Sequence, residues 1–171
     1  AYPQRWIGKV TVTTRDGRYA RRTLREAPTL QRERTEWRDV TALVLRVASG
    51  DALKESTVAH LADRFGGSRV PEQETHDEAR NERTVVLLFG DKNPDGRDTE
   101  NATLCALRIS RAASAAAAEA GQSSSVAIAV VAGRLLADLS GTLVRDENHA
   151  RLFEAANALA AQSGTSQVLV N

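Results

Sequence analysis

The sequence contains few residues of the types that usually mark a chemical site. Among its 171 residues are one cysteine, three histidines and no methionine. A single cysteine excludes an internal disulfide framework and a cysteine zinc site. Cys105 lies in an apolar run and is expected to be a buried small hydrophobic residue, with an intermolecular bridge as the alternative. No histidine has a second ligand at helical i, i+4 spacing, so neither a metal site nor a cofactor is predicted.

Aromatic residues and long apolar runs are also scarce. Aromatics make up 4% of the chain, so a core must be built from valine, leucine, isoleucine and alanine. The closest candidate for a membrane span, residues 126–143, carries Arg134 and Asp138, so no membrane partner is predicted. Hydrophobic residues at 42% and charged residues at 26% are typical of one ordinary globular domain.

Motifs for catalysis are missing as well. Residues 123–125 (SSS) have no nucleophile elbow around them, and residues 66–69 (GGSR) lack the ending of a phosphate-binding loop. The acidic residues within 72–78 lack the glycine and the ligand spacing of an EF-hand. The sequence therefore predicts no enzyme and no small-molecule substrate.

The N-terminal part of the chain is predicted to form a β-hairpin followed by a strand. Residues 6–14 and 18–26 flank Asp16-Gly17, which is the two-residue signal of a type I′ hairpin. Residues 36–48 are strongly β-prone and form the next predicted strand.

The middle of the chain is predicted to hold a short helix, a loop and a second hairpin. Asp51 can cap a helix that Gly66-Gly67 closes, and the charged residues 68–82 are predicted to form an exposed, mobile loop. Two further strands are predicted at 83–91 and 101–110, with a turn between them at 93–96. An alanine-rich short helix is predicted at 111–122.

The last third of the chain changes from the period of a strand to the period of a helix. Residues 126–144 predict one long strand with an alternating second half. From Arg145 the spacing becomes that of an amphipathic helix, which Asp146 can cap and Gly164 can end. Its apolar side consists of Leu152, Phe153, Ala156, Leu159 and Ala160.

These elements predict an α+β fold with an N-terminal β-hairpin, an antiparallel sheet of about five strands, and a C-terminal amphipathic helix after the last long strand. A single domain over residues 1–171 is expected. Within it we expect the hairpin at 1–27, an insertion at 49–82 and the terminal helix at 146–164.

Arginines on the predicted strands are the remaining lead to a function. Arg38 and Arg46 share one face of residues 36–48, while Arg83 and Arg108 each share a face with apolar residues of their strands. If these faces coincide, the sheet offers several guanidinium groups to phosphate. Two alternatives stay open: the arginines mark strand ends that emerge into water, or the sheet is buried on both faces.

The order of these elements resembles that of the coat proteins of single-stranded RNA bacteriophages. WIGKVTVTTRDGRYARRTLRE is similar to the N-terminal hairpin of that family, and RTVVLLFGDKNPDGRDTENATLCALRIS to its central hairpin. RAASAAAAEAGQSSS occupies the place of the loop before the last strand. VAIAVVAGRLLADLSGTLV followed by RDENHARLFEAANALAAQS resembles that strand and its helix.

The resemblance implies a structural capsid protein that forms homodimers, assembles into an icosahedral shell and packages single-stranded RNA. It also implies a virion location after synthesis in the bacterial cytoplasm. The residues that it implies for RNA binding are Arg46, Arg83, Arg108, Arg38, Arg134, Ser140 and Thr142. Those that it implies for the dimer interface are Leu152, Phe153, Ala156 and Leu159.

Two other classes of protein stay open. A DNA-phage tail or head-completion ring protein would also have α+β subunits without catalytic residues. A small-ligand-binding or enzymatic α+β domain would assemble its site from residues that are scattered along the chain.

Overall fold

The computed structural model describes residues 35–48, 50–92, 94–138, 140–164 and 167–171. The predicted N-terminal hairpin lies outside these residues. The described elements are β1 (Glu36–Ala48), α1 (Glu55–Arg64), β2 (Gly67–Arg69), the 3₁₀ turn η1 (Pro71–Gln73), β3 (Thr75–Asp77), β4 (Glu82–Phe89), α2 (Asp98–Glu119), β5 (Val126–Ala137), α3 (Glu147–Gln162) and β6 (Val168–Val170). The predicted α+β class and the C-terminal helix are confirmed.

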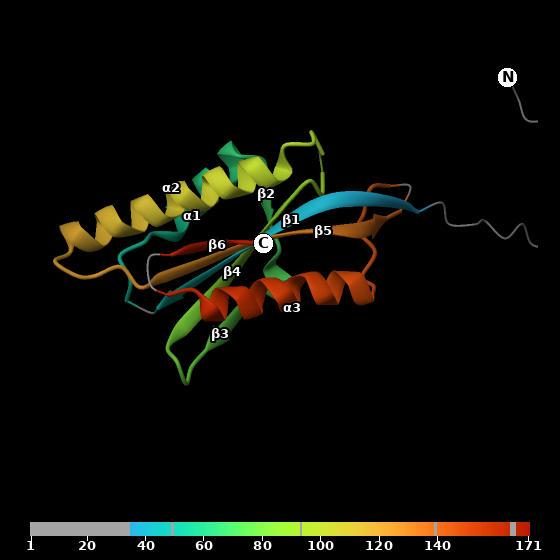
Figure 1. The fold of residues 1–171 in the computed structure, drawn as a ribbon. Coiled ribbons are helices and arrows are strands. Elements are labelled where there is room, and N and C mark those ends of the chain that lie inside the picture. The colour runs from blue at the N-terminus through green and yellow to red at the C-terminus, as the bar shows by residue number, and fades with distance from the viewer. Residues whose placement is uncertain (1–34, 49, 93, 139, 165–166) are drawn as a thin grey trace, which may run out of the picture. The chain divides into compact units, whose positions relative to one another are not determined.

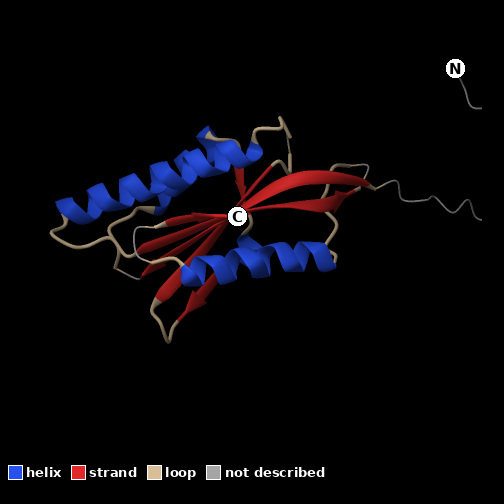
Figure 2. Cartoon of the chain, in the orientation of Figure 1, coloured by secondary structure: helices blue, strands red, loops and turns tan. Residues whose placement is uncertain are grey.

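The strands form one sheet (Figure 2). It has six strands, with β1 in its centre. The order is β2-β4-β1-β5-β6, and β3 pairs with β4 beside β2. β1 is antiparallel to both β4 and β5, as expected for an antiparallel sheet. The sheet is nevertheless mixed, because the short C-terminal strand β6 runs parallel to β5.

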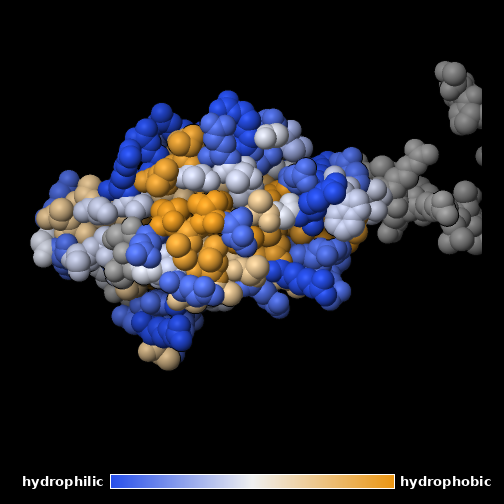
Figure 3. Space-filling view, in the orientation of Figure 1, coloured by the Kyte–Doolittle hydropathy of each residue, from blue (hydrophilic) through white to orange (hydrophobic). Residues whose placement is uncertain are grey.

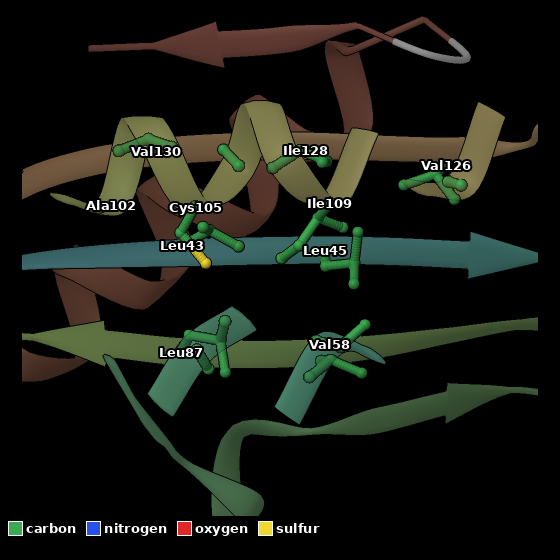
Figure 4. Close-up of a cluster of buried hydrophobic side chains, with 14 of the residues drawn as sticks. Leu43, Leu45, Val58, Leu87, Ala102, Cys105, Ile109, Val126, Ile128 and Val130 are labelled. Atoms are coloured by element: carbon green, nitrogen blue, oxygen red, sulfur yellow. The ribbon is translucent and has the colours of Figure 1, made fainter. Parts of the chain in front are cut away.

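Helices cover both faces of this sheet (Figure 1). α1 and α2 pack on one face, where Leu43 and Leu45 of β1 meet Val58 of α1 and Ile109 of α2 (Figure 4). α3 packs on the other face. The sheet is therefore buried on both sides, which is one of the alternatives that the sequence leaves open. Strands buried on both faces carry apolar side chains at successive positions, as these strands do.

Cys105 lies in the core between α2 and the sheet, as predicted, and is fully buried. Burial raises the pKa of its thiol to about 12. The thiolate is the reactive form of cysteine, so this residue contributes packing and no chemistry at neutral pH.

The predicted strand at 101–110 is wrong, because these residues belong to α2. The buried positions Ala102, Cys105, Ala106 and Ile109 recur at helical spacing and continue into the alanine-rich segment. One helix of 22 residues therefore replaces a strand and a short helix. A single apolar stripe on this helix lies against the sheet. A short apolar run fits both the two-residue period of a strand and the 3.6-residue period of a helix, and here the packing against the sheet selects the helix.

Two further predictions are wrong. Residues 68–82 are not one mobile loop, since η1 and β3 lie within them, β2 extends into them from Gly67, and both strands pair with β4. The long strand predicted to run straight into the last helix ends at Ala137 instead. A tight turn follows, and the chain pairs back through a single bridge between Ala137 and Leu143 before α3 begins.

The surface shown in Figure 3 has an apolar area between the two helix layers, over the sheet edge that β6 forms. Val170 of β6 is 53% exposed there. In the part of the chain that the structure describes, no helix has both the length and the apolarity to cross a bilayer.

Candidate functional site: a basic groove

An open groove lies on the α3 side of the sheet, at the end where β1 begins and β4 ends. It has a volume of about 380 Å³ and is lined by segments that are far apart in the sequence. Its charged side chains are Glu72, Asp91, Lys92 and Arg145, and its uncharged polar ones are Ser68, Ser140, Thr142 and His149. Arg69 borders the groove too, but it is in register with Leu87 and its side chain reaches Glu55 on the α1 face of the sheet. We call it the basic groove after Lys92 and Arg145, which carry its positive charge.

One wall of the basic groove is the tight turn between β5 and α3. The Asp138 carboxylate accepts hydrogen bonds from the backbone N–H groups of Ser140 (2.8 Å) and Thr142 (3.0 Å), and from the Ser140 hydroxyl (2.6 Å). These bonds, led by that of the Ser140 hydroxyl, lower the pKa of Asp138. Gly141 completes the turn with a φ of +82°, which glycine adopts without steric cost. The turn therefore holds the Ser140 and Thr142 hydroxyls at the groove.

Arg38 on β1 joins this turn to the loop after β4. Its Nη1 donates hydrogen bonds to the carbonyl oxygens of Asp91 (3.0 Å) and Gly141 (3.3 Å). Its Nε and Nη2 donate to the Glu36 carboxylate at 2.8 and 2.5 Å. Arg38 is expected from the sequence to bind RNA, but the structure places it as a clamp between two walls of the basic groove.

The first turn of α3 forms another part of the wall. The Asp146 carboxylate accepts a hydrogen bond from the backbone N–H of His149 (2.9 Å), which confirms the predicted helix cap and lowers the pKa of Asp146. The His149 ring is buried and lies edge-on to the Phe153 ring, with 4.8 Å between centroids. Burial, followed by the charge of Arg145, lowers the pKa of His149, although Asp146 and Glu72 act in the opposite direction. His149 is therefore neutral at pH 7.

Stability is expected to fall as the pH drops below the ordinary pKa of histidine. Because folding lowers the pKa of His149, the unfolded chain binds the proton more readily. The stabilisation is therefore complete above about pH 6.5 and is lost as the pH falls through the pKa of the folded state. Urea unfolding at about pH 7.5 and about pH 5 measures this loss, which should be smaller in His149→Gln than in the unchanged protein. Equal losses in the two proteins would contradict the assignment.

The cations at and beside the basic groove differ in how firmly they are held, and Arg69 turns its side chain to the α1 face. Arg69 is paired with Glu74 and Glu55, which raise the pKa of its guanidinium. Arg145 has one partner, Glu72, and its side chain is 70% exposed. Lys92 is exposed and takes part in no ion pair within the described residues. Lys92 and Arg145 are therefore the cations that an anionic ligand can engage most readily.

A second open groove, of about 430 Å³, lies on the opposite side of the sheet beside the first turn of α2. Its only cation among the described residues is Arg134, which is paired with Asp39 (3.0 Å) and lies over the Trp37 ring at 6.0 Å. Burial and the neighbouring Asp95 raise the pKa of Asp98, its other acid. Two carboxylates face a single, paired arginine in this groove, so we take the basic groove as the candidate site for an anion.

The fold does not bring together the arginines predicted to bind RNA. Arg46 pairs with Glu82, and Arg83 pairs with Glu55 at 3.3 Å. These two arginines occupy neighbouring register positions of β1 and β4 and therefore point to opposite faces of the sheet. Arg108 is exposed on α2 instead of lying on a strand. The predicted residues that do line the basic groove are Ser140 and Thr142.

The predicted dimer interface lies within the core of the same chain. Leu152, Phe153 and Ala156 are buried in the cluster between α3 and the sheet, and Leu159 is partly buried against it. The apolar side of α3 is expected from the sequence to contact a second copy, but it packs on its own sheet instead. This packing satisfies the hydrophobic stripe without a partner.

Lys92, Arg145 and His149 escape prediction from the sequence. The available signal is weak: Lys92 follows the strand predicted at 83–91, and Arg145 follows the one predicted at 126–144. Basic residues at strand ends are common. Lys92 and Arg145 reach one groove because β4 and β5, the strands that precede them, lie on either side of β1.

No protein-family model matches this chain, and no curated protein matches its sequence. Its fold is similar to that of the guanylyl cyclase Cya2, with a TM-score of 0.54 and 13% identity over 80% of this chain and 76% of that one. An adenylate/guanylate cyclase/hydrolase from Silicibacter pomeroyi matches with a TM-score of 0.51 and 16% identity, over 79% of this chain and 76% of that one. The catalytic core of a rhodopsin-guanylyl cyclase with converted specificity, in complex with ATPαS, matches with a TM-score of 0.50 and 12% identity, over 80% and 79%.

These similarities contradict the coat-protein interpretation and the predictions that depend on it. The capsid role, the RNA partner and the virion location are wrong, since a sheet covered by helices on both faces leaves no open face for RNA. The expectations of no enzyme and no small-molecule substrate are contradicted too, because the similar structures are cyclases and one holds ATPαS. The matches favour the third class above, a small-ligand-binding or enzymatic α+β domain. In its described residues, the chain has the fold of nucleotide cyclase domains.

Proposed function

We propose that this domain binds a nucleoside triphosphate in the basic groove. The observation that carries the proposal is the convergence of Lys92 and Arg145 on one open groove. The similarity in fold to the catalytic core that holds ATPαS supports the same class of ligand. A volume of about 380 Å³ lies within the range of small-molecule sites, roughly 300–1,000 Å³.

The phosphate oxygens would accept hydrogen bonds from the cationic side chains of the groove. Lys92 and Arg145 supply the positive charge, and Arg145 can exchange its exposed partner Glu72 for a phosphate. The hydroxyls of Ser140 and Thr142 line the same groove, but their protons are engaged, since Ser140 donates to Asp138 and Thr142 donates to Ser140. The first turn of α3 adds the partial positive charge of a helix N-terminus beside the same groove.

The residues present do not fit a resident metal ion at this site. Proteins that handle triphosphates usually hold Mg²⁺ through carboxylates. In the part of the chain that the structure describes, no group of three or more His, Cys, Asp or Glu side chains could hold a metal ion. We therefore assign the phosphate contacts to the cations and the helix terminus alone.

Replacing Arg145 with alanine tests the proposal. A hydrogen bond to a charged group contributes roughly 1.5–3 kcal/mol, so we expect Arg145→Ala to raise the Kd for ATP and GTP about tenfold or more. Isothermal titration calorimetry measures both Kd values. Cyclic AMP and cyclic GMP are quantified in the same samples, so that binding and turnover are measured separately.

Arg151→Ala is the matched control for this experiment. Arg151 lies on α3 outside the groove, pairs with Glu147, and is 68% exposed, against 70% for Arg145. Its removal should change the Kd less than about twofold, since only screened long-range charge is lost. Failure of the unchanged protein to bind either nucleotide would refute the proposed function, and so would equal effects of the two substitutions.

A further inference from the structure

We infer that the second open groove and the sheet face beside it bind a segment of a partner protein that presents an arginine next to an apolar side chain. This site lies on the side of the sheet opposite the basic groove, so the inference does not depend on the proposed function. Three features carry it: a stretch of sheet that α1 and α2 leave uncovered, a tryptophan exposed on that stretch, and an excess of negative charge in the groove.

The uncovered stretch is formed by β1 and β5 where they continue past the first turn of α2 (Figure 1). α2 begins beside Thr41 of β1, whose hydroxyl oxygen lies 2.9 Å from that of Thr99. On the α3 side of this stretch, Val40 and Leu135 are buried in the core. On the other side, among the described residues, no helix lies over the two strands beyond Thr41. One face of the same two strands is therefore packed and the other is open.

Trp37 gives the open face a large apolar surface. It is 51% exposed and is in register with Leu136 of β5, so the two side chains point to the same side of the sheet. The guanidinium of Arg134 lies over the Trp37 ring at 6.0 Å, which shows that a guanidinium can reach this ring. Tryptophan is enriched among the residues that dominate the binding energy of protein interfaces. The open face is therefore suited to contact with another polypeptide.

Negative charge exceeds positive charge in the second groove, whose charged side chains are Asp39, Asp98 and Arg134. Asp39 and Arg134 are both largely exposed, so their ion pair is weak and can be exchanged. Asp98 takes part in no ion pair within the described residues, and burial, followed by the charge of Asp95, raises its pKa. A cation that reaches Asp98 therefore pairs with a carboxylate that the described part of the chain leaves uncompensated.

These features together favour an arginine on a partner segment as the occupant. Its planar guanidinium can form two parallel hydrogen bonds with the Asp98 carboxylate, while a neighbouring apolar side chain packs on Trp37. A second copy of this chain fits less well. Two copies that dock through the same face around a twofold axis bring their own grooves together, and with them the excess negative charge of both.

Isothermal titration calorimetry of the full chain with synthetic peptides tests the inference. The probe is a capped hexapeptide of alternating leucine and arginine, and the matched control is a capped hexapeptide of alternating leucine and glutamate. We expect the arginine peptide to bind, and the glutamate peptide to give no heat of binding at concentrations up to about 1 mM. Added NaCl should raise the Kd of the arginine peptide, since it screens the charges involved.

Three variants locate the binding site. Asp98→Asn keeps the shape of the side chain and should raise the Kd about fivefold or more, and Trp37→Ala should raise it about tenfold. Glu154→Gln is the control for lost charge, because Glu154 is exposed on α3, on the other side of the sheet. It should change the Kd less than about twofold.

Failure of the unchanged protein to bind the arginine peptide would overturn the inference, and so would equal binding of the two peptides. Equal effects of Asp98→Asn and Glu154→Gln would do the same, because the binding would then reflect net charge alone. Sedimentation velocity of the unchanged protein and of Trp37→Ala is the remaining check, and we expect the same monomeric state for both. A dimer that is lost in Trp37→Ala would assign the open face to a second copy and would also overturn the inference.

Discussion

Replacing Phe153 with alanine is expected to lower the free energy of unfolding by about 3–5 kcal/mol, the range for removing a buried aromatic ring. Phe153 is 2% exposed and lies in the cluster between α3 and the sheet, with Leu135 and Leu152 among its members. Its ring also lies edge-on to His149, so the substitution removes an aromatic contact as well as filled volume. Urea unfolding followed by circular dichroism measures the loss.

The same experiment separates a core residue from a residue of a dimer interface. In a core, the loss caused by Phe153→Ala does not depend on protein concentration, whereas an interface residue stabilises more at higher concentration by mass action. Leu104→Ala is the control, because Leu104 is 41% exposed on α2 and its truncation should cost less than about 1 kcal/mol. If the loss caused by Phe153→Ala grows with protein concentration, the apolar side of α3 contacts a second copy of the chain, as its sequence pattern predicts.

Gly90→Ala is expected to destabilise the protein by about 2–4 kcal/mol, because two unfavourable effects add at this residue. Gly90 directly follows β4 with a φ of +83°, a conformation that costs alanine energy. A Cβ atom there would also lie 2.7 Å from the Asp39 carbonyl oxygen, which belongs to the backbone of β1 and cannot rotate away. Thermal or urea unfolding measures the change.

Gly96→Ala isolates the first of these two effects. Gly96 lies in the same β4–α2 connection with a φ of +76°, but a Cβ atom there would meet nothing within 4 Å. Its substitution should cost only the conformational strain, about 1 kcal/mol. Equal losses at the two glycines would show that β1 and β4 do not approach each other as closely as the structure has them.

Local patterns in the sequence are sufficient where one period is unambiguous. Residues 36–48 combine β-branched and apolar side chains and form β1 with the predicted bounds. The last helix is equally clear, because its apolar stripe has one period and Asp146 satisfies a free backbone N–H at its start. In both segments the type of element follows from residues that are close together in the sequence, so no contact with a distant segment is needed to predict it.

The type of element that residues 101–110 form cannot be predicted from their local pattern. Ala102, Cys105 and Ile109 fit a helix, but the same short apolar run also fits a buried strand. As a strand, this segment completes the central hairpin of the coat-protein resemblance and places Arg108 on the sheet. As part of α2, it removes that hairpin and leaves Arg108 exposed on a helix.

Local patterns are enough to predict the α+β class, the strand at 36–48, a short helix after it, the capped last helix and the buried state of Cys105. The covering of both sheet faces by helices, the central place of β1 and the groove shared by Lys92 and Arg145 arise from contacts between distant segments. The two kinds of feature differ in the sequence separation of the residues that produce them. A period or a cap depends on neighbours a few residues away, whereas the basic groove depends on which strands lie beside β1 and on a clamp from Arg38 to two distant loops.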